Sequence, residues 1–373
     1  MSVPNYYQLN YPYNINKNHL LGKYNDKTYI NNSYLMGNYG GNNTTNQVSG
    51  ISYDKICGIY NIGNNCYLNS GLQILASCTE FINELDKSNN IKGIVLFLKE
   101  AMHNLLNNKY YDPTKFIDYF SCLNTDFIKG TQCSSQDFIR TLIRNINSEY
   151  LKGIDNIISN NTQYNPKGIE LIEYEKFIIS NSIYPESKIQ SLFSGITKSY
   201  SHEKCRYCDN NVEHISFNFF IDVNLYLDNI NKKCEFSEVI KDNLGISGNL
   251  TMDCPHCHNE IVLKTETKFI KLPDILIFTI ERFQGGPNHV EIIPETPIDM
   301  ANYIDKNLSE KKTNYELFAI NIRLGSSSNF GHEKCQVKRN GIWYEINDIK
   351  YDIISKPNSY YDSSYGLFYK KIK

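Results

Sequence analysis

The stretch Cys57–Cys78, CGIYNIGNNCYLNSGLQILASC, is the part of the chain from which we interpret the rest. Its centre, residues 61–65, predicts a tight turn in which Gly63 is free to take a positive φ. Leucines then recur at i, i+4 and i+7, which predicts an amphipathic helix that begins at or near Cys66. The positive end of a helix dipole favours the thiolate form of a cysteine in that position. The pattern therefore indicates a cysteine that can attack a carbonyl.

An acyl-transfer cysteine also needs hydrogen-bond donors for the developing oxyanion. Asn61 lies five residues upstream across the turn, so its side-chain amide can join the Cys66 backbone N–H in this role. Loss of one such donor typically costs ~100-fold to 1000-fold in rate. The alternative is that Cys66 is a small buried hydrophobic residue, as most free cysteines are.

The stretch G-I-x-N-I-G-N-N-C-Y-L-N-S-x-L-Q-x-L closely resembles the cysteine box of the ubiquitin-specific proteases. These are papain-like deubiquitinases whose usual pattern is G-L-x-N-L-G-N-T-C-Y-M-N-S-x-L-Q-x-L. The resemblance implies that Cys66 is the nucleophile and Asn61 the oxyanion-hole side chain. It also implies an α+β fold with a papain-like right-hand architecture: a helical thumb, a β palm, and zinc-tipped β fingers that grip ubiquitin.

Length and composition restrict the class of protein. A chain of 373 residues can form one large domain or two small ones, and its net charge of -2 gives no electrostatic footprint for nucleic acid or an anionic membrane. Eleven cysteines, an odd number, and the absence of a signal-like N-terminus argue against a secreted disulfide framework. No apolar run approaches the ~18 to 20 residues that a membrane span needs. We therefore expect a soluble intracellular protein, cytoplasmic or nuclear, that is monomeric.

The composition divides the chain into a tail and a globular part. Residues 1–50 are rich in Asn, Tyr and Gly and predict a disordered tail. By the family resemblance, residues 51–373 form the catalytic domain. Within it we expect a helical thumb over about 51–187, fingers and palm strands with zinc knuckles over about 188–283, and a palm with the histidine box over about 284–373.

Two helices are predicted after the first one, at about 93–106 and 135–150. The second resembles the family's helix Q-Q-D-S-x-E-F-L-x-x-L-L, with Asp137 at the acidic position and Ser134 where the family usually has Asp. In the family these acids help to hold the arginine-containing tail of ubiquitin. One charge-assisted contact of ~1.5 to 3 kcal/mol is thus expected to be missing. The alternative is that this helix only packs the core.

Beyond about residue 188 the pattern alternates and predicts strands at about 191–202, 213–227 and 267–283. The last of them is too continuously apolar for a surface strand. The sequences of these segments also resemble those of the family, in which the motif LPxxLxIxLxRF precedes the last part of the domain.

Two C-x2-C pairs interrupt this strand region: Cys205 with Cys208, and Cys254 with Cys257. Paired knuckles of this kind are a zinc signature, and four thiolates hold one Zn²⁺ in a closed tetrahedral site. Such an ion is structural, because no coordination position is open to water. His256 and His258 are alternative ligands or outer contacts, and cysteines without metal are the remaining alternative.

A general base is predicted at His332, which begins HEKCQVKRNGIWYEIND. The pair Asn340–Gly341 is a strong two-residue hairpin signal, and it makes residues whose numbers sum to 681 face each other. Lys334 then opposes Asn347, so that His332 shares a face with Asn347 at the diagonal position. Asp348 is expected on the opposite face, and a β-bulge would reverse the choice.

The same segment resembles the family's histidine box, G-H-Y-x-x-Y-x-K followed by W-Y-x-F-[ND]-D. The resemblance implies that Asn347 orients His332 in a Cys-His-Asn triad. Glu333 and Gln336 replace the two tyrosines, which in the family border the cleft for the ubiquitin tail. One hypothesis is that Glu333 restores the acid missing at Ser134. The closing YGLFYKKIK is similar to the family's terminal strand.

The expected function is that of a thiol-dependent deubiquitinase that hydrolyses the (iso)peptide bond after the C-terminal glycine of ubiquitin, without a cofactor in the chemistry. Two alternatives stay open: a protease for another ubiquitin-like modifier, and a catalytically weak ubiquitin-binding module. Retention of Cys66, Asn61, His332 and Asn347 argues against the binding module. A zinc-dependent nucleic-acid binder is disfavoured because no basic stripe lies near the knuckles.

Overall fold

The structure, a computed structural model, describes most of the chain after residue 55. The described residues are 56–87, 92–150, 163–181, 186–227, 230, 232–244, 246–283, 287–325, 327, 330–357 and 361–373. Residues 51–373 form one compact unit, which is the subject of the description below. The tail predicted for residues 1–50 lies outside the described residues.

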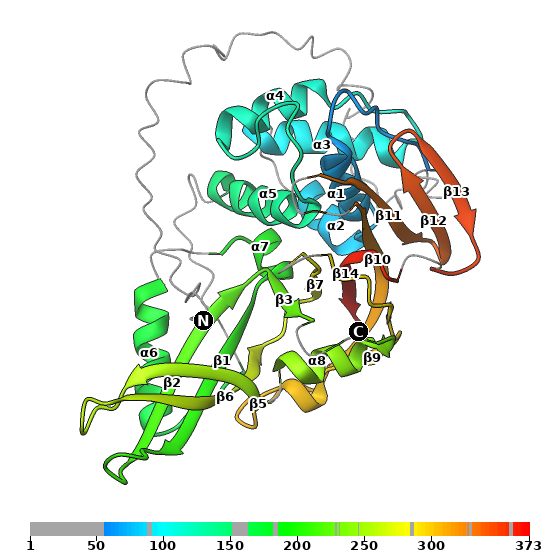
Figure 1. The fold of residues 1–373 in the computed structure, drawn as a ribbon. Coiled ribbons are helices and arrows are strands. Elements are labelled where there is room, and N and C mark those ends of the chain that lie inside the picture. Colours follow the sequence, from blue (N-terminus) through cyan, green and yellow to red (C-terminus); the bar gives the residue numbers. More distant parts are fainter. Residues whose placement is uncertain are drawn as a thin grey trace. The chain divides into compact units, whose positions relative to one another are not determined.

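Helices dominate the first part of this unit (Figure 1). They are α1 (Cys66–Ala76), α2 (Thr79–Lys87), α3 (Gly93–Leu106), α4 (Thr114–Leu123), α5 (Ser135–Tyr150), α6 (Ile169–Asn181) and α7 (Lys188–Phe193). The helices predicted at 93–106 and 135–150 are confirmed as α3 and α5. No helix in the described part of the chain is long and apolar enough to cross a membrane.

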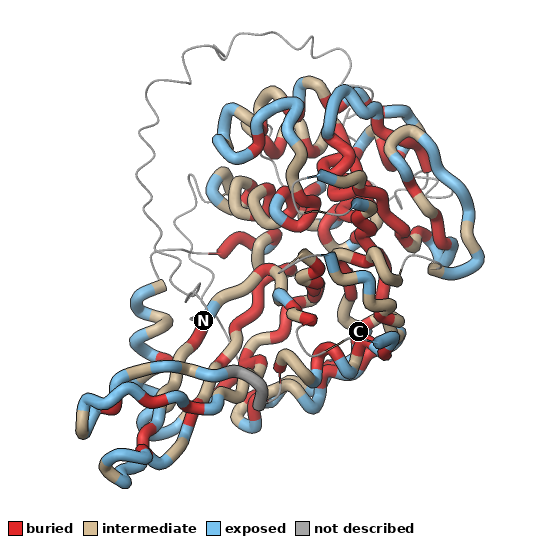
Figure 2. Tube along the Cα trace, viewed as in Figure 1, coloured by how far each residue is buried: buried red, intermediate tan, exposed pale blue. Residues whose placement is uncertain are grey.

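Helix α1 is the centre of the helical part. Every one of its residues is buried, and it packs against α3, α5 and strand β11 (His332–Arg339). Gly71 allows this close packing, because a Cβ there would lie 2.6 Å from a ring carbon of Phe138 on α5. Figure 2 shows the buried residues gathered in α1 and the strands beside it. The first residue of α1, Cys66, is therefore carried by an element with little freedom to move.

The main sheet has the strand order β13-β12-β11-β10-β14-β7-β3, with β9 pairing to β10. Its other strands are β3 (Asp222–Tyr226), β7 (Ile275–Glu281), β9 (Ile298–Asp299), β10 (Asn314–Leu324), β12 (Ile342–Asn347), β13 (Lys350–Ile354) and β14 (Ser364–Lys371). Strand β7 lies between β14 and β3 and is buried over six of its seven residues, as its unbroken apolar run predicts.

A second sheet of four strands has the order β2-β1-β6-β5. Its strands are β1 (Gly195–Lys204), β2 (Asn211–Phe220), β5 (Ile246–Asp253) and β6 (Glu260–Lys271). Helix α6 covers β2 through aromatic contacts of Tyr174 and Phe177 with Phe217. The β1–β2 and β5–β6 hairpins each end in one of the cysteine pairs, so the two pairs are carried by the same sheet.

The predicted strands are confirmed only in part. The stretches 213–227 and 267–283 each divide into two strands of different sheets, β2 and β3 in the first and β6 and β7 in the second. The strand expected from residue 191 begins only at Gly195, because residues 188–193 form α7, whose start is capped by the Ser187 hydroxyl. Helix α8 (Phe236–Leu244) interrupts the predicted strand region and lies next to the short parallel pair β4 (Cys234–Glu235) and β8 (Ile292–Ile293). Its buried residues recur with helical spacing, so the helix is amphipathic.

Candidate active site

The turn before α1 has the conformation that its sequence predicts. Gly63 has a φ of 129° and Asn64 a φ of 52°. The Asn65 side chain accepts a hydrogen bond from the Ile62 N–H at 2.7 Å, which holds the turn together. Helix α1 begins at Cys66, so the sulfur lies where backbone N–H groups have no partner within the helix.

The hairpin of β11 and β12 also has the predicted register. Paired residues such as Cys335 and Ile346 have numbers that sum to 681, and no register shift interrupts the ladder. Asn340 and Gly341 both take positive φ, 50° and 82°. The register puts His332 and Asn347 together, with His332 Nε2 and Asn347 Oδ1 2.6 Å apart.

The imidazole of His332 also interacts with the Cys66 side chain. This contact raises the pKa of His332 to about 9, although partial burial of the ring acts in the opposite direction. The Asn347 hydrogen bond and the Asp348 charge add to the increase. Because Nε2 faces Asn347, we assign Nδ1 as the ring nitrogen that interacts with the Cys66 sulfur. The raised pKa favours the imidazolium form, so the ring can take the thiol proton and stabilise the thiolate beside it.

Asp348 has a role that the sequence analysis missed. It lies in the two-residue turn between β12 and β13 with a φ of 54°. One oxygen accepts from the Asn61 amide at 2.9 Å and the other from the Asn69 amide at 2.8 Å. Asn61 is therefore held by one of its two N–H donors, and the second is available to a substrate oxygen.

Gly58 allows the turn of Asp348 to lie against the strand-like segment before α1. A Cβ at Gly58 would lie 2.3 Å from the Ile349 Cα. The Ile59 N–H donates to the Asp348 carbonyl at 3.0 Å across this contact. The glycine at the start of the cysteine box was the available signal, but the sequence does not show which backbone approaches it.

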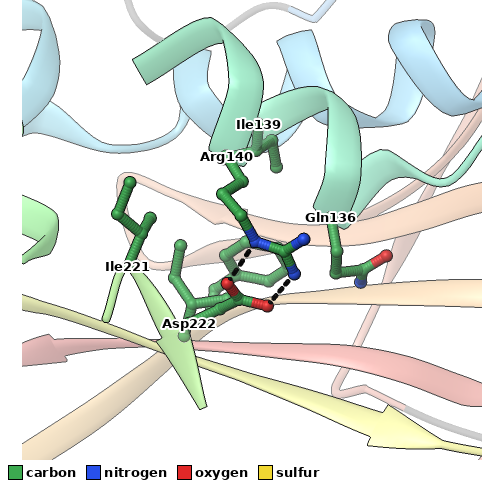
Figure 3. Close-up of a pocket in the computed structure, with 7 residues that line it drawn as sticks. Gln136, Ile139, Arg140, Ile221 and Asp222 are labelled. Carbon is green, nitrogen blue, oxygen red and sulfur yellow. Dashed lines mark hydrogen bonds and ion pairs between the residues drawn. The ribbon is translucent and has the colours of Figure 1, made fainter. Parts of the chain in front are cut away.

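Ser134 and Asp137, the positions that the family resemblance assigns to the ubiquitin tail, have partners within the protein. The Ser134 hydroxyl donates to Gln136 Oε1 at 3.0 Å. Arg140 donates to Asp137 at 2.8 Å, and its guanidinium also grips the Asp222 carboxylate through two bonds of 2.7 and 2.6 Å. Figure 3 shows this fork where α5 meets β3. The Asp137 carboxylate, 57% exposed, thus already has an internal arginine partner.

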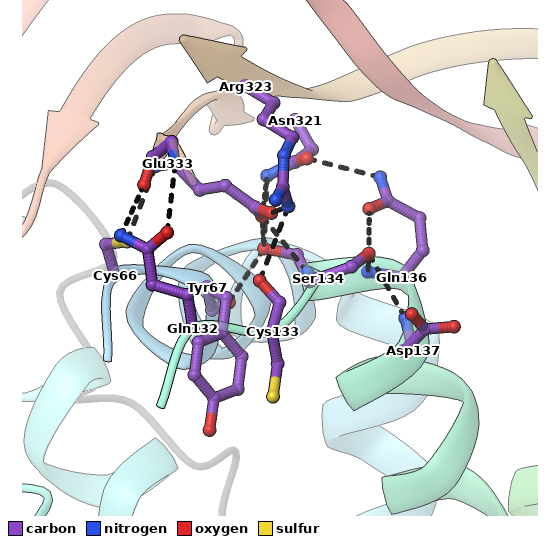
Figure 4. A network of polar contacts seen from close by, with 12 residues as sticks. Cys66, Tyr67, Gln132, Cys133, Ser134, Gln136, Asp137, Asn321, Arg323 and Glu333 are labelled. Atoms are coloured by element: carbon purple, nitrogen blue, oxygen red, sulfur yellow. Dashed lines mark hydrogen bonds and ion pairs between the residues drawn. The ribbon is translucent and has the colours of Figure 1, made fainter. Parts of the chain in front are cut away.

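Glu333 is buried and paired. Its side chain is only 2% exposed and receives Arg323 Nη1 at 2.7 Å, Asn321 Nδ2 at 3.2 Å and the Ser135 N–H at 3.0 Å (Figure 4). The hypothesis that Glu333 replaces the acid missing at Ser134 is therefore wrong, because the carboxylate is not free to meet a substrate arginine.

The four knuckle cysteines lie together at the tips of the two hairpins. Their sulfur atoms all lie within 4.8 Å of one another, with Cys205 and Cys257 3.7 Å apart and Cys208 and Cys254 3.8 Å apart. Four ligands at ~2.3 Å from a tetrahedral Zn²⁺ would be about 3.8 Å apart, so the set fits this ion. The two knuckles have matching turns, with Asp209 and His258 at positive φ, 62° and 58°. Among the described residues His256 and His258 are not part of the cluster.

The chain is similar to known proteins in sequence and in fold. Residues 57–369 match the family described as "Ubiquitin carboxyl-terminal hydrolase". The chain is 22% identical to Ubiquitin carboxyl-terminal hydrolase 23 of Arabidopsis thaliana over 335 residues, which cover 86% of this chain and 36% of the relative. It is 24% identical to Probable ubiquitin carboxyl-terminal hydrolase 4 of Schizosaccharomyces pombe over 368 residues, covering 87% and 60% respectively. The chain thus spans between about a third and three fifths of these relatives' lengths.

The fold is similar to that in solved structures of the SAGA Ubp8/Sgf11/Sus1/Sgf73 DUB module. The structure bound to ubiquitin aldehyde matches with a TM-score of 0.64 and 22% identity, covering 88% of this chain and 72% of that chain. The one bound to monoubiquitin matches with a TM-score of 0.64, 20% identity and the same coverage. The α+β fold expected from the family resemblance is confirmed. With most of its length matched by the family profile, the chain belongs to the ubiquitin carboxyl-terminal hydrolase family.

Proposed function

We propose that this chain is a thiol-dependent deubiquitinase that hydrolyses the (iso)peptide bond after the C-terminal glycine of ubiquitin. The observation that carries the proposal is the Cys66–His332–Asn347 arrangement: a thiol at a helix start, interacting with an imidazole whose Nε2 lies 2.6 Å from an amide oxygen. A protein that only binds ubiquitin does not need a nucleophile, a base and an orienting amide placed together.

In the proposed reaction, His332 takes the Cys66 proton and the thiolate attacks the glycine carbonyl. The oxyanion accepts hydrogen bonds from the second N–H of Asn61 and from the Cys66 backbone N–H. The tetrahedral intermediate collapses as the amine leaves with the proton of His332. A water molecule that gives its proton to His332 then hydrolyses the thioester and frees Cys66. Asn347 keeps the ring in the tautomer that these transfers need.

The test is incubation with ubiquitin that carries a C-terminal electrophile. We expect a covalent adduct with the natural sequence, no adduct with Cys66→Ala, and an unchanged adduct with Cys122→Ala. Cys122 is the matched control because it is an exposed free cysteine. An adduct that persists in Cys66→Ala contradicts the assignment of the nucleophile.

A second candidate is a protease for another ubiquitin-like modifier. Its support is the changed tail positions, since Ser134 carries no charge and Asp137 is already paired with Arg140. A modifier tail with fewer arginines would lose less from these changes than the ubiquitin tail. Electrophile probes made from other modifiers, used beside the ubiquitin probe, separate the two candidates by the relative rate of adduct formation.

We also propose one structural Zn²⁺ held by the four knuckle cysteines, which would join the tips of the two hairpins and take no part in hydrolysis. Metal analysis of the purified protein is expected to give about one zinc per chain.

A thiolate nucleophile and a cysteine metal site both need reduced cysteines, and all eleven cysteines are free. This chemistry fits the reducing cytoplasm or nucleus, where we propose that the chain acts as a monomer.

A further inference from the structure

Both chain neighbours of His332 are tied to the segment that leads into α5. The side-chain amide of Gln132 accepts from the Gly331 N–H at 2.9 Å and donates to the Gly331 carbonyl at 2.8 Å. On the other side, the Glu333 carboxylate accepts from the Ser135 N–H at 3.0 Å and contacts the Ser135 hydroxyl. The helical part therefore contacts the chain on both sides of His332.

The Glu333 carboxylate is a charged group inside the protein. Arg323, its cross-strand partner on β10, donates at 2.7 Å, and both side chains are at most 5% exposed. Burial raises the pKa of Glu333, while the Arg323 charge and the Ser135 hydrogen bonds act against this increase. A buried ion pair costs so much desolvation that apolar residues of similar size often stabilise a fold equally well. Stability alone is therefore a poor explanation for the pair.

The same contacts reach the nucleophile. The Ser135 hydroxyl lies between the Glu333 carboxylate and the carbonyl of Tyr67, at 2.7 Å from the latter, and can donate its single proton to either acceptor. Tyr67 follows Cys66 on α1. The backbone N–H of Glu333 itself points to the Cys66 sulfur at 3.4 Å. One carboxylate thus connects the residue after the base to the residue after the nucleophile, through a single serine.

We propose that Glu333 is a positioning residue. Through Ser135 and Arg323, its carboxylate fixes β11 against α1, so that His332 and the Glu333 N–H meet the Cys66 sulfur in one geometry. This role rests on the proposed hydrolysis by Cys66. The carboxylate does not touch the substrate. It acts by aligning His332 with the Cys66 sulfur, and a displacement of ~1 Å between such groups costs on the order of 100-fold in rate.

The test compares Glu333→Gln with the natural sequence in two assays. Glu333→Gln keeps the size of the side chain but leaves Arg323 without its counter-charge and places an amide N–H₂ among donors. For a fluorogenic C-terminal amide of ubiquitin, we expect kcat to fall ~10-fold to 100-fold with KM within about threefold. The rate of Cys66 alkylation by iodoacetamide, followed by mass spectrometry from pH 5 to 9, is expected to fall about tenfold at pH 7. Unchanged kcat and an unchanged alkylation profile overturn the proposal.

Two further variants keep the test decisive. Asp305→Asn is the matched control, because Asp305 is a buried carboxylate paired with Lys198 on β1. It is expected to lower Tm but to leave kcat and alkylation within about twofold. If Glu333→Gln does not fold, Ser135→Ala removes only the serine link and is expected to lower kcat about tenfold; natural kcat in that variant overturns the proposal. If the natural sequence does not cleave the ubiquitin amide, only the proposed function fails, because the alkylation comparison uses no ubiquitin.

Discussion

Replacing Gly58 by alanine is predicted to lower activity, although Gly58 contributes no catalytic side chain. The effect would come from the close contact between the backbones of Gly58 and Ile349. The new Cβ would lie 2.3 Å from the Ile349 Cα, whereas ordinary contact begins near 3.4 Å. The two backbones must therefore separate by about 1.1 Å, the difference of these distances. Because the displaced turn adjoins Asn347 and contains Asp348, the shift reaches the groups that hold His332 and Asn61. We expect kcat/KM to fall on the order of 100-fold, and overpacking to cost ~1–3 kcal/mol in the free energy of unfolding.

The assay for Gly58→Ala measures kcat/KM on the fluorogenic ubiquitin amide and Tm on the same preparation. Gly195→Ala is the matched control, since its Cβ would lie 2.1 Å from the Phe220 ring and 2.8 Å from the Lys271 carbonyl, at the start of β1. Both variants are expected to lose stability, but only Gly58→Ala should lose most of its activity. If the two variants lose kcat/KM to the same extent, the proposed link between the Gly58 contact and the active site is incorrect.

Three other predictions follow from the site. The pKa of His332 is about 9, so its imidazolium form is lost and kcat/KM should decline as pH rises past about 9. The same shift stabilises the folded state relative to the unfolded state, in which the pKa is 6.5. This contribution to the free energy of unfolding is complete below pH 6.5 and disappears as pH rises to about 9. Asn347→Ala should move this limb to lower pH, and an unmoved limb would contradict the assigned contact. Asp348→Ala should lower kcat ~10-fold to 100-fold with little change in KM, because Asn61 loses its acceptor; an unchanged kcat would mean that Asn61 needs no such support. Cys254→Ser should abolish zinc in metal analysis and lower Tm, whereas Cys122→Ser should retain the metal.

The sequence predicted those features that depend on local chemistry. The turn at residues 61–65, the start of α1 and the Asn340–Gly341 hairpin each follow from residues that favour a particular φ, so their register could be worked out by counting. The pairing of His332 with the side chain of Asn347 then followed from strand parity. Helix α8 was missed although its apolar residues recur at helical spacing, because the surrounding alternation favoured strands.

The sequence could not predict contacts between distant segments. From its charge alone, Glu333 was interpreted as an accessible acid. The β10–β11 register shows instead that Arg323 lies directly opposite and forms an ion pair with it. Strand parity correctly predicted that Asn347, and not Asp348, is hydrogen-bonded to the imidazole. It could not show that the β12–β13 turn places the Asp348 carboxylate beside Asn61. Both misses concern buried or turn positions where a tertiary partner overrides the local pattern.

The two halves of the site differ in how firmly they are held. Cys66 begins a helix that is buried over its whole length, so the sulfur cannot move without disturbing the core. His332 is only half-buried and Asn347 is exposed, so the imidazole depends on β11 and β12 for its position. Those strands are fixed where they touch the helical part, at Gly58, Gln132 and Glu333. Substitutions at these contacts should therefore change the distance between sulfur and imidazole, whereas substitutions inside α1 should lower stability before they change that distance.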